Sequence, residues 1–429
     1  MYKKIFNTMV FPVVELASKT SIQKKLEFLI KSQYFTEHEI GAYQESRLKA
    51  VIKHAYENVP YYRNLFDSLK IKPEDIKSKK DLKKLPFLTK KLVNEHYDEL
   101  LARDYLGKSK PKSTSGSSGE PTVFYQTKED FSWIWASHFR AWSWFGCRIG
   151  DKYVKISVNE DRHRIDKKIQ DALFRCLYIH IKNMNNHQID EHITKIIRYG
   201  PAVIYGYSSS INAIAERMIE KNVYCNCKGV ITTGDALLPS FRKNIECRFL
   251  CKVYDEYGCG GEGLYIAAQC EEGSYHISDE LMIVEVESGE VIVTSFNNYA
   301  MPLIRYKPGD LAVPGQCKCG RTLSVFKKIN GRSHDVVKTI RGDILNSPFF
   351  ETVFESISGV SQFQIIQKDM KGIMILIKKG GKYSKATAEK KIRQNITDAA
   401  GKPFDIDIVY VENILSEKNG KVKSIKSSV

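Results

Sequence analysis

Apolar residues change their spacing along the chain, and the change predicts where helices and strands lie. Residues 22–110 are largely polar, with apolar side chains such as Val51, Ile52 and Ala55 at helical spacing. The segment Asn58–Arg63 contains Pro60, which predicts the end of that helix. The first quarter of the chain is therefore expected to be helical.

Between residues 150 and 310, short β-rich runs alternate with helical ones. The predicted strands are 153–158, 202–205, 229–233 and 250–254. The predicted helices are 187–199, 208–222 and 238–247. This alternation favours an α/β domain with a substantially parallel sheet. Residues 281–286 and 290–295, joined through Ser288-Gly289, predict a hairpin.

Beyond Gly331-Arg332 the pattern changes once more. A helix over 348–357, strands over 361–367 and 372–378, a helix over 384–399 and a strand over 405–411 predict a small α+β unit. The fold class is thus α/β: a large N-terminal domain of mixed sheets and helices, followed by a small C-terminal α+β domain. The expected segments are 1–110 (helical), 111–333 (core of the large domain) and 334–429 (small domain).

Charge and composition indicate which classes of binding partner to expect. The chain has 429 residues and a net charge of +16, which favours anionic ligands such as nucleotides. Lys and Arg are dispersed and aromatic residues cluster apart from them, so binding of nucleic acid is ranked low, as is a scaffold role. Met1–Ser21 is mildly amphipathic without a cleavable signal or a membrane-spanning run, so we expect a cytoplasmic protein with at most peripheral membrane contact. The oligomeric state stays open, a homodimer included.

Ten cysteines in a large chain without an export signal indicate reduced thiols or metal ligands. Cys317 and Cys319 form a Cys-x-Cys turn with glycine, and Cys270 and His276 flank the turn Glu271-Glu272-Gly273. A hairpin that brought the two pairs together would give structural zinc a Cys₃His ligand set. The alternative is buried thiols and an exposed histidine.

A polar loop precedes the predicted strand 123–126. It contains Ser113, Thr114, Ser115, Gly116, Ser117, Ser118 and Gly119, and Glu120-Pro121 ends it. Unhindered N–H groups and hydroxyls can wrap anionic oxygens, and the two glycines can take positive φ. No Lys-Ser/Thr pair follows the second glycine, so this is not a P-loop. A flexible linker is the alternative.

The same loop resembles the phosphate loop of the adenylate-forming superfamily. The segments Asn58–Arg63 and Gly206–Ser210 narrow the resemblance to the phenylacetate–CoA ligase branch and its relatives in capsular polysaccharide biosynthesis. This resemblance covers essentially the whole chain. It implies ATP and Mg²⁺ as cofactor and metal, and a small C-terminal domain that moves between two half-reactions.

The resemblance also implies roles for individual residues. Residues 113–119 would bind phosphates and Glu262 would hold Mg²⁺, with Asp255 and Glu256 as alternatives because one extra residue separates Tyr257 from Glu262. Lys421 would stabilise the transition state, with Lys423 as the alternative, and Asp335 would be the hinge. The adenine and ribose positions would be Gly234, Asp235, Tyr257, Gly258, Asp310 and Arg332, of which Arg332 is also a catalytic candidate. The acyl pocket would be lined by Tyr205, Gly206, Tyr207 and Ser208.

These observations predict a ligase that activates a carboxylic acid as an acyl-adenylate with release of pyrophosphate. The acyl group would then pass to CoA. The alternative acceptor is an amine, such as an amino sugar in surface polysaccharide assembly. The acid, the acceptor and the pathway are left open by the sequence.

Overall fold

The computed structural model of the chain describes residues 5–113, 122–157, 165–181, 185–332, 336–342, 344–380, 383–400, 404–415 and 422–429. Two compact units are interleaved along the sequence. The first comprises Met1–Asp151, Glu256–Pro308 and Ala312–Lys328, and the second comprises Lys152–Asp255, Gly309–Leu311 and Ile329–Val429. Strands β7 (Val253–Cys259), β12 (Asp310–Gly315) and β13 (Val325–Arg332) each cross from one unit into the other.

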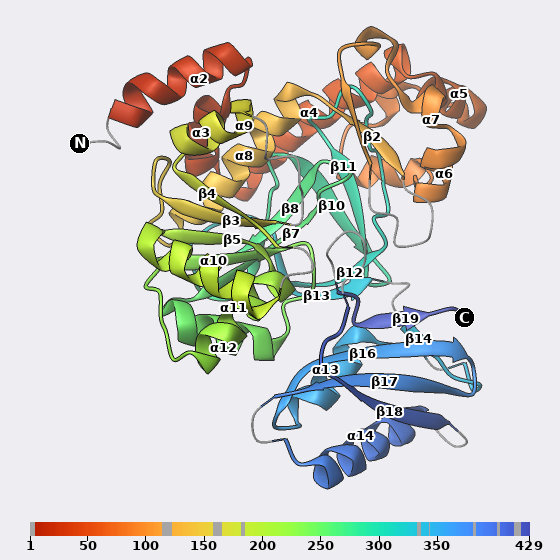
Figure 1. The fold of residues 1–429 in the computed structure, drawn as a ribbon. Helices are drawn as coiled ribbons and strands as arrows, with labels where there is room; N and C mark the ends of the chain where they lie inside the picture. The colour runs from red at the N-terminus through yellow and green to blue at the C-terminus, as the bar shows by residue number, and fades with distance from the viewer. Residues whose placement is uncertain are drawn as a thin grey trace. The chain divides into compact units, whose positions relative to one another are not determined.

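The N-terminal part of the first unit is helical, as its apolar spacing predicts (Figure 1). Its α-helices are α2 (Phe11–Ser18), α3 (Ile22–Ser32), α4 (Glu37–Asn58), α5 (Pro60–Leu69), α6 (Lys90–Glu95), α7 (Tyr97–Leu100) and α8 (Lys128–Ser143). Thr36 and Glu39 form a capping box that starts α4, and Pro60 is the first residue of α5. The predicted break at Pro60 is therefore confirmed.

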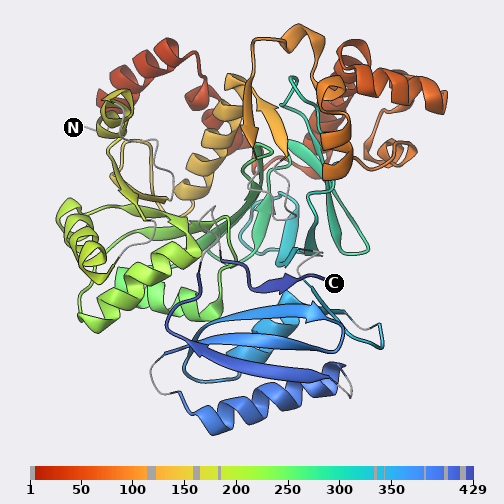
Figure 2. The same cartoon turned by 45° about the vertical axis from the view of Figure 1, so that its right-hand side comes forward.

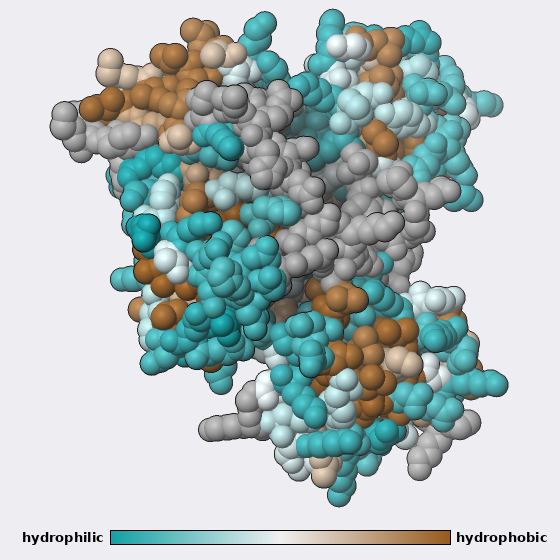
Figure 3. Space-filling view, in the orientation of Figure 1, coloured by the Kyte–Doolittle hydropathy of each residue, from teal (hydrophilic) through white to brown (hydrophobic). Residues whose placement is uncertain are grey.

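A π-helical turn, Phe6–Val10, leads into α2, and together they cover part of the core with one face only. Phe6 and Phe11 are buried, whereas Met9, Val13 and Leu16 are exposed on the other face. Figure 3 shows this face as a hydrophobic strip at the N-terminal end of the chain. Among the described helices, none combines the length and apolar content that crossing a bilayer needs.

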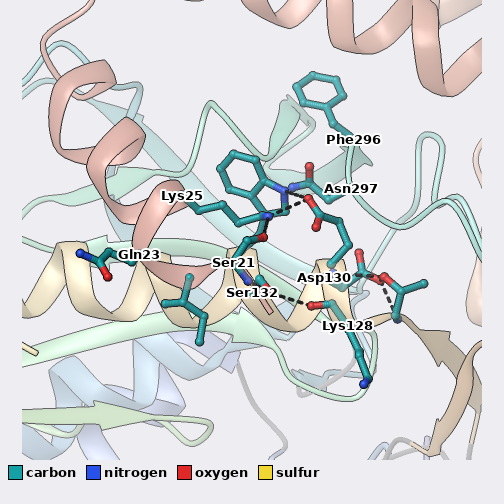
Figure 4. Close-up of polar contacts among 12 residues, drawn as sticks. Ser21, Gln23, Lys25, Lys128, Asp130, Ser132, Phe296 and Asn297 are labelled. Atoms are coloured by element: carbon teal, nitrogen blue, oxygen red, sulfur yellow. Dashed lines mark hydrogen bonds and ion pairs between the residues drawn. The ribbon is translucent and has the colours of Figure 1, made fainter. Parts of the chain in front are cut away.

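Polar contacts stabilise the packing of the N-terminal end of α3 on the N-terminal end of α8 (Figure 4). Lys25 is buried, yet its ammonium bonds the Ser21 hydroxyl at 2.5 Å and pairs with Glu129 at 2.8 Å. The Ser21 amide donates to the Ser132 hydroxyl at 3.2 Å. Trp133 lies beneath the Lys25 ammonium at 5.1 Å, which favours the buried charge.

The remaining strands of the first unit are largely antiparallel. They are β1 (Lys110–Ser113), β2 (Val123–Gln126), β8 (Leu264–Gln269), β9 (Tyr275–Ile277), β10 (Met282–Glu287) and β11 (Glu290–Ser295). Strand β8 pairs with β7 and β9, and β9 also pairs with β13. The predicted hairpin is confirmed as β10 and β11, joined at Ser288 and Gly289, both of which have positive φ.

The second unit begins with parallel strands that alternate with helices, as predicted. In order along the chain these are β3 (Tyr153–Ser157), α9 (Ile165–Leu173), β4 (Cys176–His180), α10 (Asn186–Tyr199), β5 (Val203–Tyr207), α11 (Ser208–Glu220), β6 (Gly229–Thr233) and α12 (Pro239–Phe249). The parallel strands follow the order β6-β5-β3-β4, and α11 packs on β3, β5 and β6. Asn185 and Gln188 cap the start of α10, and Gly200 ends it with positive φ.

The C-terminal part of the second unit is a four-stranded sheet with helices (Figure 2). Its elements are β14 (Val336–Lys338), β15 (Ile344–Asn346), α13 (Ser347–Glu355), β16 (Val360–Asp369), β17 (Gly372–Lys379), α14 (Lys385–Ala400), β18 (Asp405–Val411) and β19 (Ile425–Ser427). The sheet order is β18-β17-β16-β19, and Ile365, Ile375 and Ile392 are fully buried in its core. The parallel sheet with its helices and this four-stranded sheet with its helices confirm the predicted α/β class.

Candidate active site and cysteine–histidine cluster

Strand β7 carries the predicted aromatic residue Tyr257, and the tight turn after it carries the predicted acid Glu262. The pairing of β7 with β8 shifts register between Tyr257 and Gly258. A Cβ atom on Gly258 would lie 2.5 Å from the Leu264 carbonyl oxygen, so only glycine fits where the strands approach. The turn that follows brings Glu262 into the interior, where it is 5% exposed.

Among the residues that the structure describes, two polar groups contact the buried Glu262 carboxylate. The Lys90 ammonium lies 3.3 Å from Oε1, and the Tyr306 hydroxyl donates to the same oxygen at 3.3 Å. Both contacts are long for charge-assisted hydrogen bonds, which favour about 2.7–2.9 Å. The carboxylate is therefore compensated by weak contacts, a condition that suits exchange for a metal cation.

Sequence reasoning missed Lys90, and the fold explains why it arrives at this site. Leu88 and Tyr306 form a parallel bridge, with the Leu88 amide donating to Arg305 at 3.1 Å and the Lys307 amide donating to Leu88 at 2.9 Å. Helix α6 begins two residues after Leu88, so its first residue is Lys90. The bridge joins segments that are far apart in the sequence, so no local sequence pattern predicts it.

The Arg305 side chain stabilises this bridge through contacts with the neighbouring strand and with the segment before Leu88. Its side chain is buried and pairs with Glu285 at 3.2 Å and Glu287 at 2.8 Å. It also donates to the Leu85 carbonyl at 2.8 Å and lies over the Phe87 ring at 4.4 Å. Arg305 thereby holds the segment before Lys90, so its part in the site is positional.

The alternative acids at this turn are occupied. Glu256 is buried and accepts a hydrogen bond from Tyr265 at 3.0 Å, and it lies 2.7 Å from His138 Nδ1. In the second unit, Asp255 accepts from the Thr232 hydroxyl at 2.6 Å. Of the three acids, Glu262 has the weakest contacts, which favours it as the metal ligand.

In the second unit, Asp235 caps helix α11. Its Oδ1 accepts from the Ser208 amide at 2.7 Å and the Ser208 hydroxyl at 2.8 Å, while Oδ2 accepts from the Ser209 amide at 3.2 Å. Burial raises the pKa of Asp235, and the four bonds from Ser208 and Ser209 lower it in part. Ser208, predicted for the acyl pocket, and Asp235, predicted for the adenine side, thus bond each other where β5–α11 meets β6–α12.

The rest of the predicted acyl pocket lies on the same strand end. Gly206 permits close packing of β5 on β3, because a Cβ there would meet the Ile156 carbonyl oxygen at 2.5 Å. Tyr205 and Tyr207 flank it, and burial raises the pKa of Tyr207. Gly234 has a φ of 81°, which the turn before Asp235 requires.

A hollow in the second unit joins this turn to the end of the chain. It is lined by Ser209, Asp235, Ala236, Leu238, Phe241, Gln362, Phe363, Val422 and Ser424.

The other predicted site residues lie at strand ends or outside the described residues. Asp310 is buried at the start of β12, and Arg332 ends β13. Ser113 ends β1. The predicted residues Thr114–Gly119, Asp335 and Lys421 lie outside the described residues.

The cysteine and histidine side chains of the predicted metal site do come together. One ligand atom from each of Cys270, His276, Cys317 and Cys319 lies within 4.8 Å of the other three. Cys270 and His276 are buried, and the other two are half-buried. The hairpin expected to join the two pairs is formed by β8, β9 and β13.

Comparison with known proteins adds sequence relatives over most of the chain. Residues 337–428 match the family model for the CapK C-terminal domain. The chain is 26% identical over 364 residues to a phenylacetate–coenzyme A ligase of Escherichia coli (strain K12), covering 76% of this chain and 79% of that protein. It is 23% identical over 404 residues to protein CapK of Staphylococcus aureus, covering 88% and 87%.

Solved structures share the fold at lower identity. A 2-hydroxyisobutyryl-CoA ligase in its postadenylation state gives a TM-score of 0.76 at 19% identity, covering 92% of this chain and 91% of that one. The same ligase in its thioesterification state gives 0.60. The predicted resemblance is thus confirmed: the chain is related in sequence to phenylacetate–CoA ligases and CapK, and its fold is that of adenylate-forming acyl-CoA ligases.

Proposed function

We propose that this chain activates a carboxylic acid with ATP and transfers the acyl group to coenzyme A. The observation that carries the proposal is the similarity to phenylacetate–CoA ligases, which extends over 70–76% of the chain in the four relatives of that name. The buried Glu262 carboxylate, weakly held by Lys90 and Tyr306, supports it from the geometry.

The proposed reaction has two steps. In the first, a carboxylate oxygen of the acid forms a bond to the α-phosphorus of ATP, the bond to the β-phosphate breaks, and pyrophosphate leaves. In the second, the thiol sulfur of CoA bonds to the acyl carbon, the acyl–oxygen bond breaks, and AMP leaves with the release of the thiol proton. Both steps are balanced without an oxidant or reductant.

Different residues of this chain would bind the metal and each part of the nucleotide. Glu262 would hold Mg²⁺, which offsets charge on the phosphates when bound. Asp310 and Arg332 would bind the ribose, residues 113–119 the phosphates, and Tyr257 the adenine. Lys421 would approach the α-phosphate in the first step and withdraw, with rotation at Asp335, before the second.

The structure suggests different work for Ser208 and Asp235. Their mutual hydrogen bonds fix the start of α11 and the turn before α12. We expect them to position Tyr207 and Ala236 rather than to touch substrate. Ala236 offers its carbonyl to the Ser208 hydroxyl at 2.8 Å, so its own position is fixed by the same network.

An amine acceptor is the second candidate. The similarity to CapK covers 88% of the chain, and the CapK C-terminal model matches residues 337–428. The resemblance to proteins of capsular polysaccharide biosynthesis implies an acceptor such as an amino sugar. Acyl transfer would then form an amide bond with loss of the amine proton.

ATP–pyrophosphate exchange tests the first step against a panel of aryl, hydroxy, fatty and amino acids. Exchange that depends on one class of acid is the expected result. Addition of CoA, or of an amino sugar in its place, then identifies the acceptor from the product mass. An absence of exchange with every acid, in protein that still melts cooperatively, would contradict the proposal.

A further inference from the structure

We propose that Cys270, His276, Cys317 and Cys319 bind one zinc ion that holds two turns of the first unit together. The Sγ atoms of Cys270 and Cys317 are 3.6 Å apart, and Cys319 Sγ lies 3.2 Å from His276 Nε2. Tetrahedral zinc with Zn–S near 2.3 Å and Zn–N near 2.0–2.1 Å requires separations of about 3.8 Å and about 3.5 Å for such pairs. The observed separations are a few tenths of an ångström short of those values.

The backbone presents these four groups from two glycine turns and from strand β9, which contains His276. Cys270 opens the turn between β8 and β9, where its amide bonds Ser274 at 2.9 Å and Gly273 has a φ of 79°. The second turn, before β13, holds Cys317 and Cys319, followed by Gly320 with a φ of 84°. Because β9 pairs with both β8 and β13, the two turns meet at one edge of these strands.

The surroundings fit a metal thiolate centre. Three thiolates and one zinc ion carry a net charge of −1, which needs a nearby cation. The Arg321 guanidinium bonds the Cys319 sulfur. It also lies over the Trp144 ring at 4.5 Å and bonds both oxygens of Glu271 at 3.1 and 3.0 Å, so its charge is shared between that thiolate and the Glu271 carboxylate. Trp144 also packs edge-on against His276 at 5.7 Å, which fixes the imidazole plane.

Four protein ligands leave no position for a substrate, so the ion would be structural. Its position indicates what it would stabilise. Next to the cluster, Thr322 bonds the carbonyls of Gln33 at 3.0 Å and Phe35 at 2.5 Å, which joins this turn to the connection between α3 and α4. On the other side, β9 and β8 lead to β7 and the turn that carries Glu262.

Two other states of the same residues compete with zinc binding. A disulfide between Cys270 and Cys317 needs a separation of about 2.05 Å, whereas the observed one is 3.6 Å. Three reduced thiols beside a histidine, without metal, would leave this cluster with only weak hydrogen bonds. The metal content of the purified protein separates these states directly.

The test is elemental analysis of the full-length chain, purified without chelators from zinc-supplemented medium. We expect about one zinc per chain. Cys319→Ser and His276→Gln should lose most of it and melt at lower temperature. Cys247→Ser, at an exposed cysteine outside the cluster, should keep the wild-type content and melting temperature.

A second measurement needs no variant to fold. In the wild-type protein, a mercurial reagent that blocks thiols should release zinc, detected with a chromogenic chelator. Cobalt(II) in its place should give thiolate-to-metal charge-transfer absorption. Wild-type protein without bound metal, whose melting temperature does not respond to zinc or to chelator, would overturn the proposal, as would a Cys270–Cys317 disulfide in non-reduced peptides.

Discussion

Two buried carboxylates of the first unit, Glu262 and Glu285, are compensated in opposite ways. Glu285 is 6% exposed and faces the Arg305 guanidinium through both of its oxygens at 3.2 and 3.3 Å, backed by Glu287 and the Leu85 carbonyl. Glu262 is 5% exposed and receives a half-exposed ammonium and a phenol at one oxygen. The first arrangement is fixed by a planar group with several donors, whereas the second can exchange its partner.

This difference indicates which of the two carboxylates can exchange its partner for a metal cation. A guanidinium with several acceptors around it cannot leave without stranding charges, so the Arg305 cluster holds the fold. A lysine on a flexible stem can move aside when a divalent cation enters. The same kind of substitution at each carboxylate should therefore have different effects on stability and on activity.

The largest effect is expected from Arg305→Met. It would leave Glu285 buried without a counter-charge and lower the free energy of unfolding by about 3–5 kcal/mol. Urea unfolding followed by circular dichroism measures the loss. Arg103→Met, at an exposed arginine, is the control and should change the free energy by less than about 0.5 kcal/mol. Equal stabilities for the two variants would contradict a structural role for Arg305.

The next largest effect is expected from Glu262→Gln. The amide keeps the shape of the side chain but cannot offer an anionic ligand, so ATP–pyrophosphate exchange should fall by about 10²- to 10³-fold. The melting temperature should change little. Glu285→Gln is the matched change at the other carboxylate: it should lower stability while the exchange rate of the folded protein stays near that of the wild type. The reverse pattern would show that the roles are exchanged.

A smaller effect is expected from Lys90→Met. If Lys90 only neutralises Glu262 until a cation enters, its removal should lower the Mg²⁺ concentration for half-maximal exchange by about fivefold, equivalent to about 1 kcal/mol. Lys91→Met is the control, because Lys91 is exposed and pairs with Glu95. A fall in exchange as large as that of Glu262→Gln would instead assign Lys90 a direct contact with the nucleotide.

The smallest effect is expected from Ser208→Ala. The variant loses hydrogen bonds to Asp235 and the Ala236 carbonyl but keeps the backbone cap of α11, so unfolding should be easier by about 1 kcal/mol. The KM for the acid should stay within about twofold if Ser208 positions the turn without touching substrate. A large rise in KM, with unchanged stability, would place the hydroxyl in the acyl pocket as the sequence suggested.

Much of the fold followed from local pattern, because alternation and helical spacing are properties of short segments. The strands near 153, 203 and 229, the hairpin at 290 and the helices and strands expected between 348 and 411 all appear where predicted. Strand β4 and helix α9 were missed, since Cys176–His180 has no clear alternation and α9 is short. Sheet order could not be predicted, because it depends on pairing between distant segments.

The site was predictable only where a motif lies in one stretch. Such a stretch is formed by Tyr257 and Gly258 in β7 and Glu262 in the turn that follows. Lys90 was not found, because only the bridge between Leu88 and Tyr306 brings it to Glu262. The cysteine–histidine convergence could be predicted because each half is a short turn, and a hairpin is the simplest way to join them.

The most direct test of the central claim follows one oxygen atom. With the acid identified by the exchange panel, its carboxylate is labelled with ¹⁸O and one turnover is run with ATP and the acceptor. Attack on the α-phosphorus followed by acyl transfer predicts one ¹⁸O atom in AMP and none in pyrophosphate. Label in inorganic phosphate, with ADP as the nucleotide product, would contradict the acyl-adenylate route.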